Sequence, residues 1–518
     1  MLISKKHKKV LINSRNPNLL LSTIPTAKAI TFRGNTLVAV PHRLDETRVL
    51  RNMGYKVPPP VEVHYNWPGK YKPFRHQVAT AGFLTMNPRA FVLNQIGTGK
   101  TLSVLWAYDY LRSCGAANKL LLVSPLSTLE RVWADEIFKH FPHLTYVVLH
   151  ATNSQRRFKL LDIDADIYII NHDGVKVMSK RLAERKDIDC VAVDELAEYR
   201  NAKTSRWTHM HRVLQGRTWV WGLTGSPTPK APTDAWAQVR LICPDNVPKF
   251  FTRFRDMVMR QMSMYKWVPR VEAPFVVRDA MQPAVLYKRE ECLDLPPCTV
   301  STRDVGMSQQ QAKAYKDMLN RLRMEYQGGE VTAVNESVKM MKLVQIACGV
   351  AYGVDGSSVI LPTPERIQAV LDIAQEADGK VIVYVPLTGG LHRIAEALQQ
   401  GGYSVGVVHG ETPKAERDEI FAAFQSRKDP EVLVAHPKCM AHGLTLTEAN
   451  VIVWYIPTND YSIYEQACGR ITRSGQQRSQ HIIHLEGSSI ERRMYSRLEN
   501  KGNAQGALLD LIKEDQEA

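Results

Sequence analysis

The stretch Asn94-Gln95-Ile96-Gly97-Thr98-Gly99-Lys100-Thr101 constrains this chain more than any other part of it. An apolar run, residues 90–93, precedes it, and apolar residues at helical spacing follow it from Leu102 to Cys114. A strand, a glycine loop and a helix in this order form a phosphate cradle, because backbone N–H groups point inward at the positive helix end. The loop therefore predicts a nucleotide site, with Mg²⁺ on the hydroxyl of Thr101 and contacts from Gly97, Thr98, Gly99 and Lys100.

The loop departs from the P-loop pattern at its first position, where Asn94 stands in place of glycine. A chance glycine-rich turn between a strand and a helix is the alternative interpretation. The segment Pro73-Phe74-Arg75-His76-Gln77, about twenty residues upstream, favours a nucleotide. The Gln77 amide can pair with both the donor and the acceptor on the adenine edge, and Phe74 can stack on the ring.

Composition limits the partners of this 518-residue chain. Lys and Arg number 67 against 52 Asp and Glu, a net charge of +15, which favours a polyanionic partner. Charge alone does not separate nucleic acid from an anionic membrane surface. No apolar run approaches the roughly 20 residues of a membrane span, and the N-terminus lacks a signal-peptide pattern, so we expect a cytoplasmic protein without membrane contact. The eight dispersed cysteines form no C-x-x-C pair and are expected to be reduced.

Apolar runs alternate with helical patterns from residue 90 to residue 226, which predicts a parallel sheet covered on both faces. After the first run, the expected strands are residues 119–123, 145–149, 166–170, 190–193 and 218–223. Ligands in such folds lie at the carboxyl ends of the strands. The polar motifs fall at these ends, which predicts one site built from several loops.

Asp194 and Glu195 follow one of these strands. Two buried acids are costly unless they meet a metal or a polar ligand. We expect Asp194 to hold Mg²⁺ and Glu195 to orient and deprotonate the water that attacks the γ-phosphate of ATP. A helix N-cap is the alternative interpretation, and the expected position of the pair on a strand beside the phosphate loop argues against it.

A second alternating region begins near residue 360, with expected strands at 381–385, 404–408, 432–435, 451–456 and 481–485. It lacks a P-loop. Arg470 and Arg473 are three residues apart, so on a helix both would project from one face and neutralise charge on a transferring phosphoryl group. A surface helix of a basic protein is the alternative.

Two regions are less regular. Residues 1–70 contain an expected hairpin, 30–32 with 36–40, and a basic start that is either a DNA contact or a solvated tail. Aromatic and basic residues interleave from residue 249 to 255, which fits either nucleic-acid binding or packing of an inserted helical element.

Taken in order, these motifs resemble those of the superfamily 2 helicases, and most closely the Snf2-type DNA translocases, over residues 71–500. The compact chain is also similar to small Snf2-like proteins of phages and bacteria. The resemblance implies an α/β fold of two RecA-like lobes, each a parallel sheet flanked by helices. The implied domains are an N-terminal accessory region (1–70), an ATP-binding lobe (71–245), a helical insertion or linker (246–345), a second lobe (346–500) and a C-terminal tail (501–518).

The resemblance also implies residue roles. Gln77 would read adenine, and the DNA phosphate contacts would be Ser127, Thr128, Thr388 and Thr445. Residues 223–227 match a coupling motif, with Thr224 and Ser226 as its hydroxyls. Residues 466–476 match the motif that carries Gln466, Arg470 and Arg473, the catalytic partners of Lys100 and Glu195. Departures from the family pattern are Ala197 in place of a histidine, Met440 and Ala441 in place of glycines, and Thr445 in place of an asparagine.

The implied function is an ATP-hydrolysing motor that moves along DNA, with double-stranded DNA favoured, and that uses ATP and Mg²⁺. In this hypothesis the second lobe closes to bring Arg470 and Arg473 to the γ-phosphate. The alternatives are a strand-separating or annealing helicase and an ATP-gated nucleic-acid-binding clamp. No sequence feature identifies a protein partner.

Overall fold

The computed structural model describes residues 1–32, 35–263, 266–292, 294–327, 333–352, 358–440 and 445–517. The chain forms two compact units: Met1–Cys292 with Ala507–Ala518, and Leu293–Gly506. None of the described helices is both long enough and apolar enough to cross a membrane.

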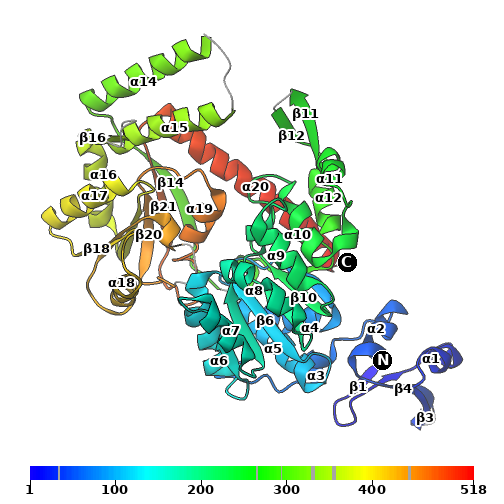
Figure 1. Ribbon diagram of the computed structural model, residues 1–518. Coiled ribbons are helices and arrows are strands. Elements are labelled where there is room, and N and C mark those ends of the chain that lie inside the picture. Colours follow the sequence, from blue (N-terminus) through cyan, green and yellow to red (C-terminus); the bar gives the residue numbers. More distant parts are fainter. Residues whose placement is uncertain are drawn as a thin grey trace. The chain divides into compact units, whose positions relative to one another are not determined.

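A seven-stranded parallel sheet forms the centre of the first unit, in the order β13-β5-β10-β9-β6-β8-β7 (Figure 1). All six strands predicted between residues 90 and 223 are present. The bounds of the seven strands are β5 Arg89–Val92, β6 Lys119–Ser124, β7 Tyr146–Val148, β8 Ile167–Asn171, β9 Ile188–Val193, β10 Trp219–Leu223 and β13 Ala284–Val285.

Helices cover both faces of this sheet, because successive strand residues point to opposite sides. Leu120 and Leu122 enter one hydrophobic core, whereas Leu121 and Val123 enter the other. The first core is shared with α4 (Arg75–Met86), α5 (Lys100–Ser113) and α6 (Asp135–His140). The second core is shared with α7 (Ser154–Asp162), α8 (His172–Glu184), α9 (Ser205–Leu214) and α10 (Asp234–Ile242). The expected α/β architecture is confirmed for this unit.

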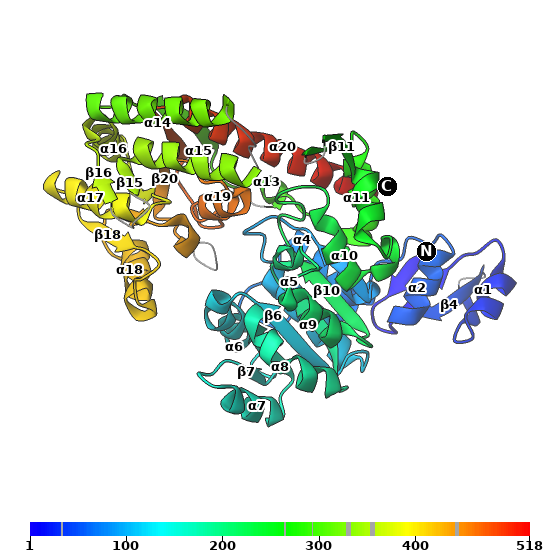
Figure 2. The ribbon, with the colours of Figure 1, turned by 45° about the horizontal axis from the view of Figure 1, so that its top comes forward.

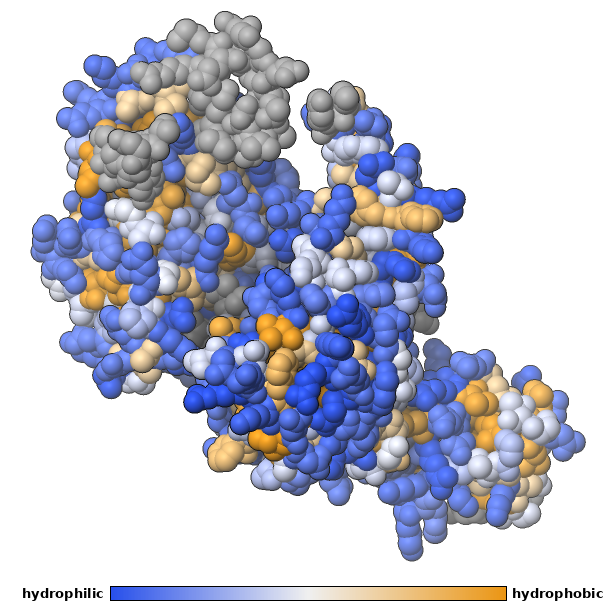
Figure 3. Space-filling view, in the orientation of Figure 1, coloured by the Kyte–Doolittle hydropathy of each residue, from blue (hydrophilic) through white to orange (hydrophobic). Residues whose placement is uncertain are grey.

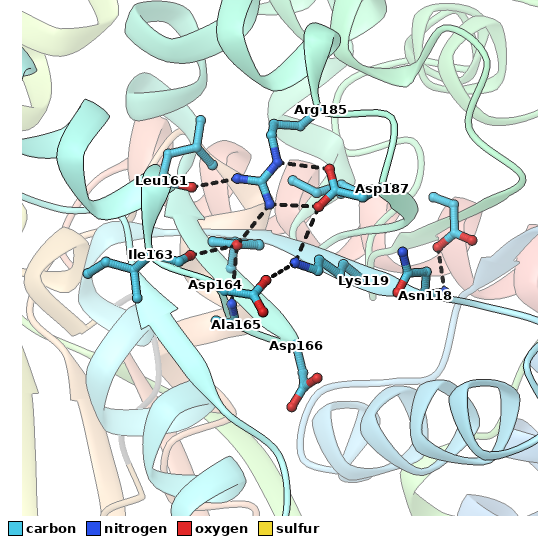
Figure 4. Close-up of polar contacts among 12 residues, drawn as sticks. Asn118, Lys119, Leu161, Ile163, Asp164, Ala165, Asp166, Arg185 and Asp187 are labelled. Carbon is cyan, nitrogen blue, oxygen red and sulfur yellow. Dashed lines mark hydrogen bonds and ion pairs between the residues drawn. The ribbon is translucent and has the colours of Figure 1, made fainter.

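Ion pairs join the amino ends of three strands in the first unit (Figure 4). Lys119, the first residue of β6, contacts Asp164 before β8 and Asp187 before β9, the latter at 3.3 Å. Two nitrogens of Arg185 donate to the Asp187 carboxylate at 2.7 and 2.8 Å, and these bonds hold the pKa of Asp187 well below its usual range. The amino ends of these three strands are therefore held together by structural ion pairs.

Residues 1–64 form an accessory domain on the first unit (Figure 1). Its antiparallel sheet has the order β1-β2-β4-β3, and the predicted hairpin is present as β3 and β4. Gly34, expected in that turn, lies outside the described residues. The bounds are β1 Leu2–Ser4, β2 Lys9–Ile12, α1 Pro17–Thr23, β3 Lys28–Phe32, β4 Asn35–Pro41, α2 Leu44–Asn52 and α3 Pro60–His64.

An insertion follows α10 in the first unit. It contains α11 (Phe251–Val258), a hairpin of β11 (Met259–Ser263) with β12 (Lys266–Pro269), and α12 (Ala273–Ala280). Phe254 is buried against the unit, whereas Phe250 and Phe251 are exposed, so the aromatic run divides between packing and solvent.

The second unit has a six-stranded parallel sheet in the order β14-β21-β20-β17-β19-β18. The five strands predicted after residue 360 are present, which confirms a second α/β lobe. The strands are β14 Cys298–Asp304, β17 Lys380–Tyr384, β18 Val405–Val408, β19 Val432–Ala435, β20 Ala449–Trp454 and β21 Gln480–Glu486. Residues 246–345, expected to be a helical insertion or linker, thus also contain β14, which pairs along its whole length with β21.

Helices again cover both faces of the second sheet. One face packs on α15 (Ala333–Cys348), α16 (Pro364–Glu376) and α17 (Thr388–Gln400), and the other on α18 (Lys414–Ser426) and α19 (Tyr461–Cys468). The long helix α20 (Ser489–Glu517) contributes to both faces. α14 (Gln309–Gln327) lies beside α15 (Figure 2). A hairpin of β15 (Val350–Tyr352) and β16 (Ser358–Ile360) and a four-residue helix, α13 (Arg289–Cys292), complete the chain.

Candidate active site

The phosphate loop joins β5 to α5 in the predicted way. Gly97 and Gly99 have φ angles of +89° and +75°, and Gly99 is the N-cap of α5. The Lys100 ammonium donates to the carbonyls of Asn94 at 2.8 Å and Gln95 at 3.2 Å. The loop thus curls around a positive charge at a helix N-terminus, the arrangement that binds phosphate.

Asn94, the departure from the P-loop pattern, is fully buried. Its Nδ2 donates to Oγ1 of Thr80 on α4 at 3.0 Å. A glycine at this position could not make that bond. The side chain therefore ties the start of the loop to α4.

Two further residues of α4 hold the same loop. Gln77 accepts from the Phe74 N–H at 2.9 Å and donates to the Gly99 carbonyl at 3.3 Å. His76 Nε2 lies 2.7 Å from the Thr98 carbonyl, and burial lowers the pKa of His76, so the neutral ring donates there. A Cβ on Gly99 would lie 2.2 Å from Gln77 Nε2, which only glycine avoids.

Phe74 is placed to contact a ligand. Its side chain is about half exposed, and its ring lies parallel to that of His76, with centroids 5.6 Å apart. His76 is buried, so the exposed surface beside Gln77 is that of the Phe74 ring.

Asp194 and Glu195 leave the carboxyl end of β9. Asp194 accepts from Trp133 Nε1 at 3.3 Å and from the Glu195 N–H at 3.0 Å. Loss of hydration around the Asp194 carboxylate raises its pKa, and the nearby Lys100 ammonium and the Trp133 bond oppose that rise. Glu195 has a φ of +50°, a left-handed conformation that is uncommon outside glycine and occurs at functional sites.

The expectation that Asp194 lies on the strand next to the phosphate loop is wrong, because β10 lies between β5 and β9. β10 leads into Thr224 and Ser226, which are both buried. The Thr224 N–H donates to the Val92 carbonyl at 3.0 Å, and the Ser226 N–H donates to Thr224 Oγ1 at 3.1 Å. The predicted coupling motif thus separates the phosphate loop from the acids.

Ser127 and Thr128, two of the expected DNA phosphate contacts, follow β6 in a strand-contacting segment that consists of a 3₁₀ turn, η1 (Leu126–Thr128), and a π-helix, η2 (Leu129–Ala134). Thr128 is buried, and its hydroxyl donates to the Pro125 carbonyl at 2.9 Å. The Ser127 hydroxyl is also buried, but within the described residues it makes no hydrogen bond, so Ser127 keeps a donor that Thr128 has already used.

The remaining predicted residues lie in the second unit. The expectation that Arg470 and Arg473 share a helix is wrong: α19 ends at Cys468, and both arginines lie in the turns that follow. Tertiary bonds draw the chain away from helical geometry there, because the Arg470 carbonyl accepts from the Leu446 N–H at 3.0 Å. Arg470 and Gln466 are buried, and Arg473 is half-buried.

Arg473 meets another predicted residue. Its guanidinium donates to Thr445 Oγ1 at 3.2 Å, which joins the arginine motif to Thr445. Gly443, Leu444 and the departure at Ala441 lie outside the described residues. Thr388, the first residue of α17, is exposed.

The structure adds one segment that the sequence did not indicate. After β13, the Tyr287 carbonyl accepts from the Gln95 N–H at 3.1 Å, and the Arg289 N–H donates to Gln95 Oε1 at 2.9 Å. A two-residue edge strand gives too weak a pattern to be found by periodicity. The bonds brace the phosphate loop on the side away from β10.

The residues present fit a magnesium nucleotide. The Thr101 hydroxyl, on the first turn of α5, and the partly buried Asp194 carboxylate are the hard oxygen donors that Mg²⁺ prefers. The two carbonyls that accept from Lys100 show that its ammonium lies within the curve of the loop.

Comparison with known families gives two matches. The SNF2-related domain family matches residues 85–349, and the helicase conserved C-terminal domain family matches residues 364–475. The first match alone covers more than half of the chain.

Individual relatives are distant. The putative protein p41 of Acyrthosiphon pisum secondary endosymbiont phage 1 is 24% identical, over 85% of this chain and 98% of its own length. An uncharacterized ATP-dependent helicase of Mycoplasma genitalium is 22% identical, over 77% of this chain and 38% of its own length. The human SWI/SNF-related matrix-associated actin-dependent regulator of chromatin subfamily A member 1 is 23% identical, over 79% of this chain. The chain spans 40% of that human protein.

Among solved structures, the Sulfolobus solfataricus SWI2/SNF2 ATPase core in complex with dsDNA is similar, with a TM-score of 0.42 and 19% identity. The similarity covers 86% of this chain and 96% of the archaeal chain. With the two domain matches, the motifs and the two parallel-sheet units, the comparisons show that this chain belongs to the SNF2-related family of helicase-like ATPases.

Proposed function

We propose that this protein is a DNA-dependent motor that hydrolyses ATP, with Mg²⁺ as cofactor, to translocate on double-stranded DNA. Its work would be to remodel DNA or protein–DNA complexes, without separation of the strands. One observation carries the proposal: the charges of Lys100 at the phosphate loop and of Asp194, next to Glu195, interact at the carboxyl ends of the strands of one sheet. A protein that only binds nucleic acid gains nothing from this set.

The chain's own residues divide the work. The Lys100 ammonium exchanges the carbonyls of Asn94 and Gln95 for phosphate oxygens. Thr101 and Asp194 would hold Mg²⁺, which, when bound, offsets negative charge on the phosphate oxygens. Glu195 orients a water and accepts its proton as the water oxygen bonds the γ-phosphorus and ADP leaves.

The base and the transition state involve other residues. Gln77 reads the adenine edge with the hydrogen-bonding capacity that remains after its bonds to Phe74 and Gly99. Gln466, Arg470 and Arg473 act on the γ-phosphate, and the half-buried Arg473 is the finger we favour, because Arg470 is buried in its own unit.

Contacts to DNA are proposed from both units. Ser127 in the first unit, and Thr388 and Thr445 in the second, offer hydroxyls for backbone phosphates, which position a protein without reading sequence. Thr128 stabilises the segment, since its hydroxyl is already bonded to Pro125. The name of the human relative, a regulator of chromatin, favours duplex DNA in a protein complex as the substrate.

The test is steady-state ATP hydrolysis without polynucleotide and with double-stranded DNA, single-stranded DNA or structured RNA. Lys100→Ala serves as the blank. Strong stimulation by duplex DNA, followed by displacement of a third strand from a triplex, is the expected result. Stimulation only by single strands or RNA would favour a strand-separating helicase, and the absence of stimulation by any of them would refute the motor.

A further inference from the structure

The positive charge of this chain is concentrated at its start. Residues 1–70 contain 12 Lys and Arg and three Asp and Glu, so they carry +9 of the net +15. The other 448 residues carry only +6. This start, most of which forms the accessory domain, therefore carries a larger excess of positive charge per residue than the rest of the chain, which favours a polyanionic partner there.

These charges lie on a folded domain. Val10, Ile12, Val38 and Val40 of its sheet pack with Leu20, Ile24 and Leu50 of its helices in a core of their own. The lysines of residues 5–9 therefore belong to a folded domain with its own core, and not to a solvated tail.

Four lysines surround one turn of this domain. Lys5, Lys6 and Lys8 form the exposed turn between β1 and β2, and Lys9 begins β2. Arg43 follows directly alongside, because the His42 N–H donates to the Lys8 carbonyl at 2.8 Å. We call Lys5, Lys6, Lys8, Lys9 and Arg43 the basic turn. In Figure 3, hydrophilic side chains protrude from the lower edge of this domain.

Nothing neutralises the basic turn. Its five side chains make no hydrogen bond or ion pair within the parts of the chain that the structure describes. By contrast, Lys119 and Arg185 in the sheet unit are each paired with carboxylates. The charges of Lys5 and Lys8 also help to lower the pKa of the nearby His64, after its burial and the charge of His42.

The accessory domain is attached at the amino ends of the strands, whereas the phosphate loop lies at their carboxyl ends. Arg48 donates to the carbonyls of Met86 and Thr85, at the end of α4, both at 3.1 Å. Its guanidinium also lies 5.6 Å from the ring of Trp219, the first residue of β10. The phosphate loop lies at the other end of α4 and β10, so the basic turn has no part in nucleotide binding.

We propose that the basic turn is a second nucleic-acid contact, which grips the backbone phosphates of DNA away from the motor's own strand-contacting segments. The inference rests on the proposed function for the choice of nucleic acid over other polyanions. Lysines are flexible point charges, so the contact would depend on salt and ignore sequence. Its role would be to keep the motor on DNA between cycles of hydrolysis.

The test uses the full chain with Lys5→Gln, Lys6→Gln and Lys8→Asn combined. Asparagine is chosen because Lys8 has a φ of +48°, which asparagine tolerates. The matched control combines Lys176→Gln, Lys180→Gln and Lys186→Gln, three exposed lysines on and after α8 with no ion pair in the described structure. Both variants lose three charges, and thermal unfolding checks that both fold.

Duplex affinity is measured by fluorescence anisotropy between 50 and 200 mM salt, without nucleotide. Each lost phosphate contact should reduce the slope of log K against log[salt] by about 0.9. If three contacts are lost, raising the salt from 50 to 200 mM should weaken duplex binding by the variant about 40-fold less than it weakens binding by the wild type. The control should keep the wild-type slope.

A wild-type slope in the basic-turn variant, or an equal loss in the control, would overturn the inference. So would loss of binding to phosphatidylserine vesicles alone, since that result would identify a membrane contact. The outcome is separable from that of the motor proposal. Wild-type DNA binding that depends on the basic turn, without stimulated hydrolysis, would refute the motor and keep this contact.

Discussion

Trp133 donates its indole N–H to the carboxylate of Asp194 at 3.3 Å. Trp133 lies in the π-helix η2, directly after Ser127 and Thr128, so one residue links the segment proposed to contact DNA to the acid proposed to hold Mg²⁺. Irregular turns of this kind often mark functional sites. The bond thus ties the segment after β6 to the acid at the end of β9.

Trp133→Phe should lower DNA-stimulated kcat by about tenfold, because a hydrogen bond to a charged group contributes about 1.5–3 kcal/mol. The Mg²⁺ concentration for half-maximal activity should rise, since the pKa of Asp194 loses one of the groups that oppose its rise. Trp106→Phe is the control: that indole is equally buried and donates to the Pro68 carbonyl. An unchanged Mg²⁺ dependence in Trp133→Phe would show that the bond is only structural.

Arg473→Ala should lower kcat by about 10³-fold on saturating DNA, as loss of an arginine finger does in other phosphoryl-transfer enzymes. Affinity for a fluorescent ATP analogue should change far less. Arg478→Ala removes an exposed arginine from the same region, whose side chain donates to the Glu448 carbonyl, and should leave kcat unchanged. Wild-type turnover by Arg473→Ala would exclude this arginine as the finger.

The second unit should lose stability in acid because of His484. Burial lowers the pKa of His484 to about 4, from 6.5, while its ring stacks on Tyr495 and bonds the Tyr464 hydroxyl. The unfolded chain binds this proton more tightly, so unfolding takes up a proton between these values. The contribution is complete above pH 6.5, and about 3 kcal/mol is lost as the pH falls to 4.

Denaturant unfolding of the second unit, followed by hydrogen exchange in β21 and α20, measures this loss. His484→Gln should remove most of the pH dependence between 6.5 and 4. His481→Gln, an exposed position on the same strand, should retain it. Equal slopes in the two variants would assign the acid sensitivity to other groups.

A buried ion pair joins α16 to α20. Arg366 and Glu491 are 2.8 Å apart and almost fully buried, and Glu491 also accepts from the Gly487 N–H and the Ser488 hydroxyl. Arg366→Met should destabilise the second unit by about 3–5 kcal/mol, because it leaves a buried carboxylate without its partner.

The exposed pair of Arg303 and Glu376 is the control for this prediction. Glu376→Gln should change the unfolding free energy by no more than about 1 kcal/mol. Combining Arg366→Met with Glu491→Leu should recover most of the loss, because no charge is then left unpaired. A double variant as unstable as Arg366→Met would mean that packing, not charge, sets the cost.

Buried strands were predictable because parallel strands covered on both faces are continuous apolar runs, such as residues 119–123 and 432–435. β14 was missed because Cys298–Asp304 is a polar, exposed edge strand whose pairing depends on β21, far along the chain. The helix expected to extend through Arg473 was wrong for a related reason. Its end at Cys468 is set by tertiary bonds to residue 446, which spacing cannot show.

The residues proposed to bind the nucleotide were identified from motifs that are local in sequence, which could not show the bonds among them. Spacing identified Gln77 and the phosphate loop separately, without indicating that their backbone and side chains bond each other. The position of β10 between β5 and β9 could not be predicted from the sequence either, since strand order depends on long-range pairing.

The three bonds from α4 to the phosphate loop, made by His76, Gln77 and Thr80, have a consequence for substrate choice. In the proposed site, α4 would contact the adenine base through Gln77 and also makes the bonds that hold the phosphate loop. A purine with the wrong edge would displace Gln77 and, through Gly99, the loop itself. Replacing ATP by GTP should therefore lower the rate of hydrolysis as well as the affinity for the nucleotide.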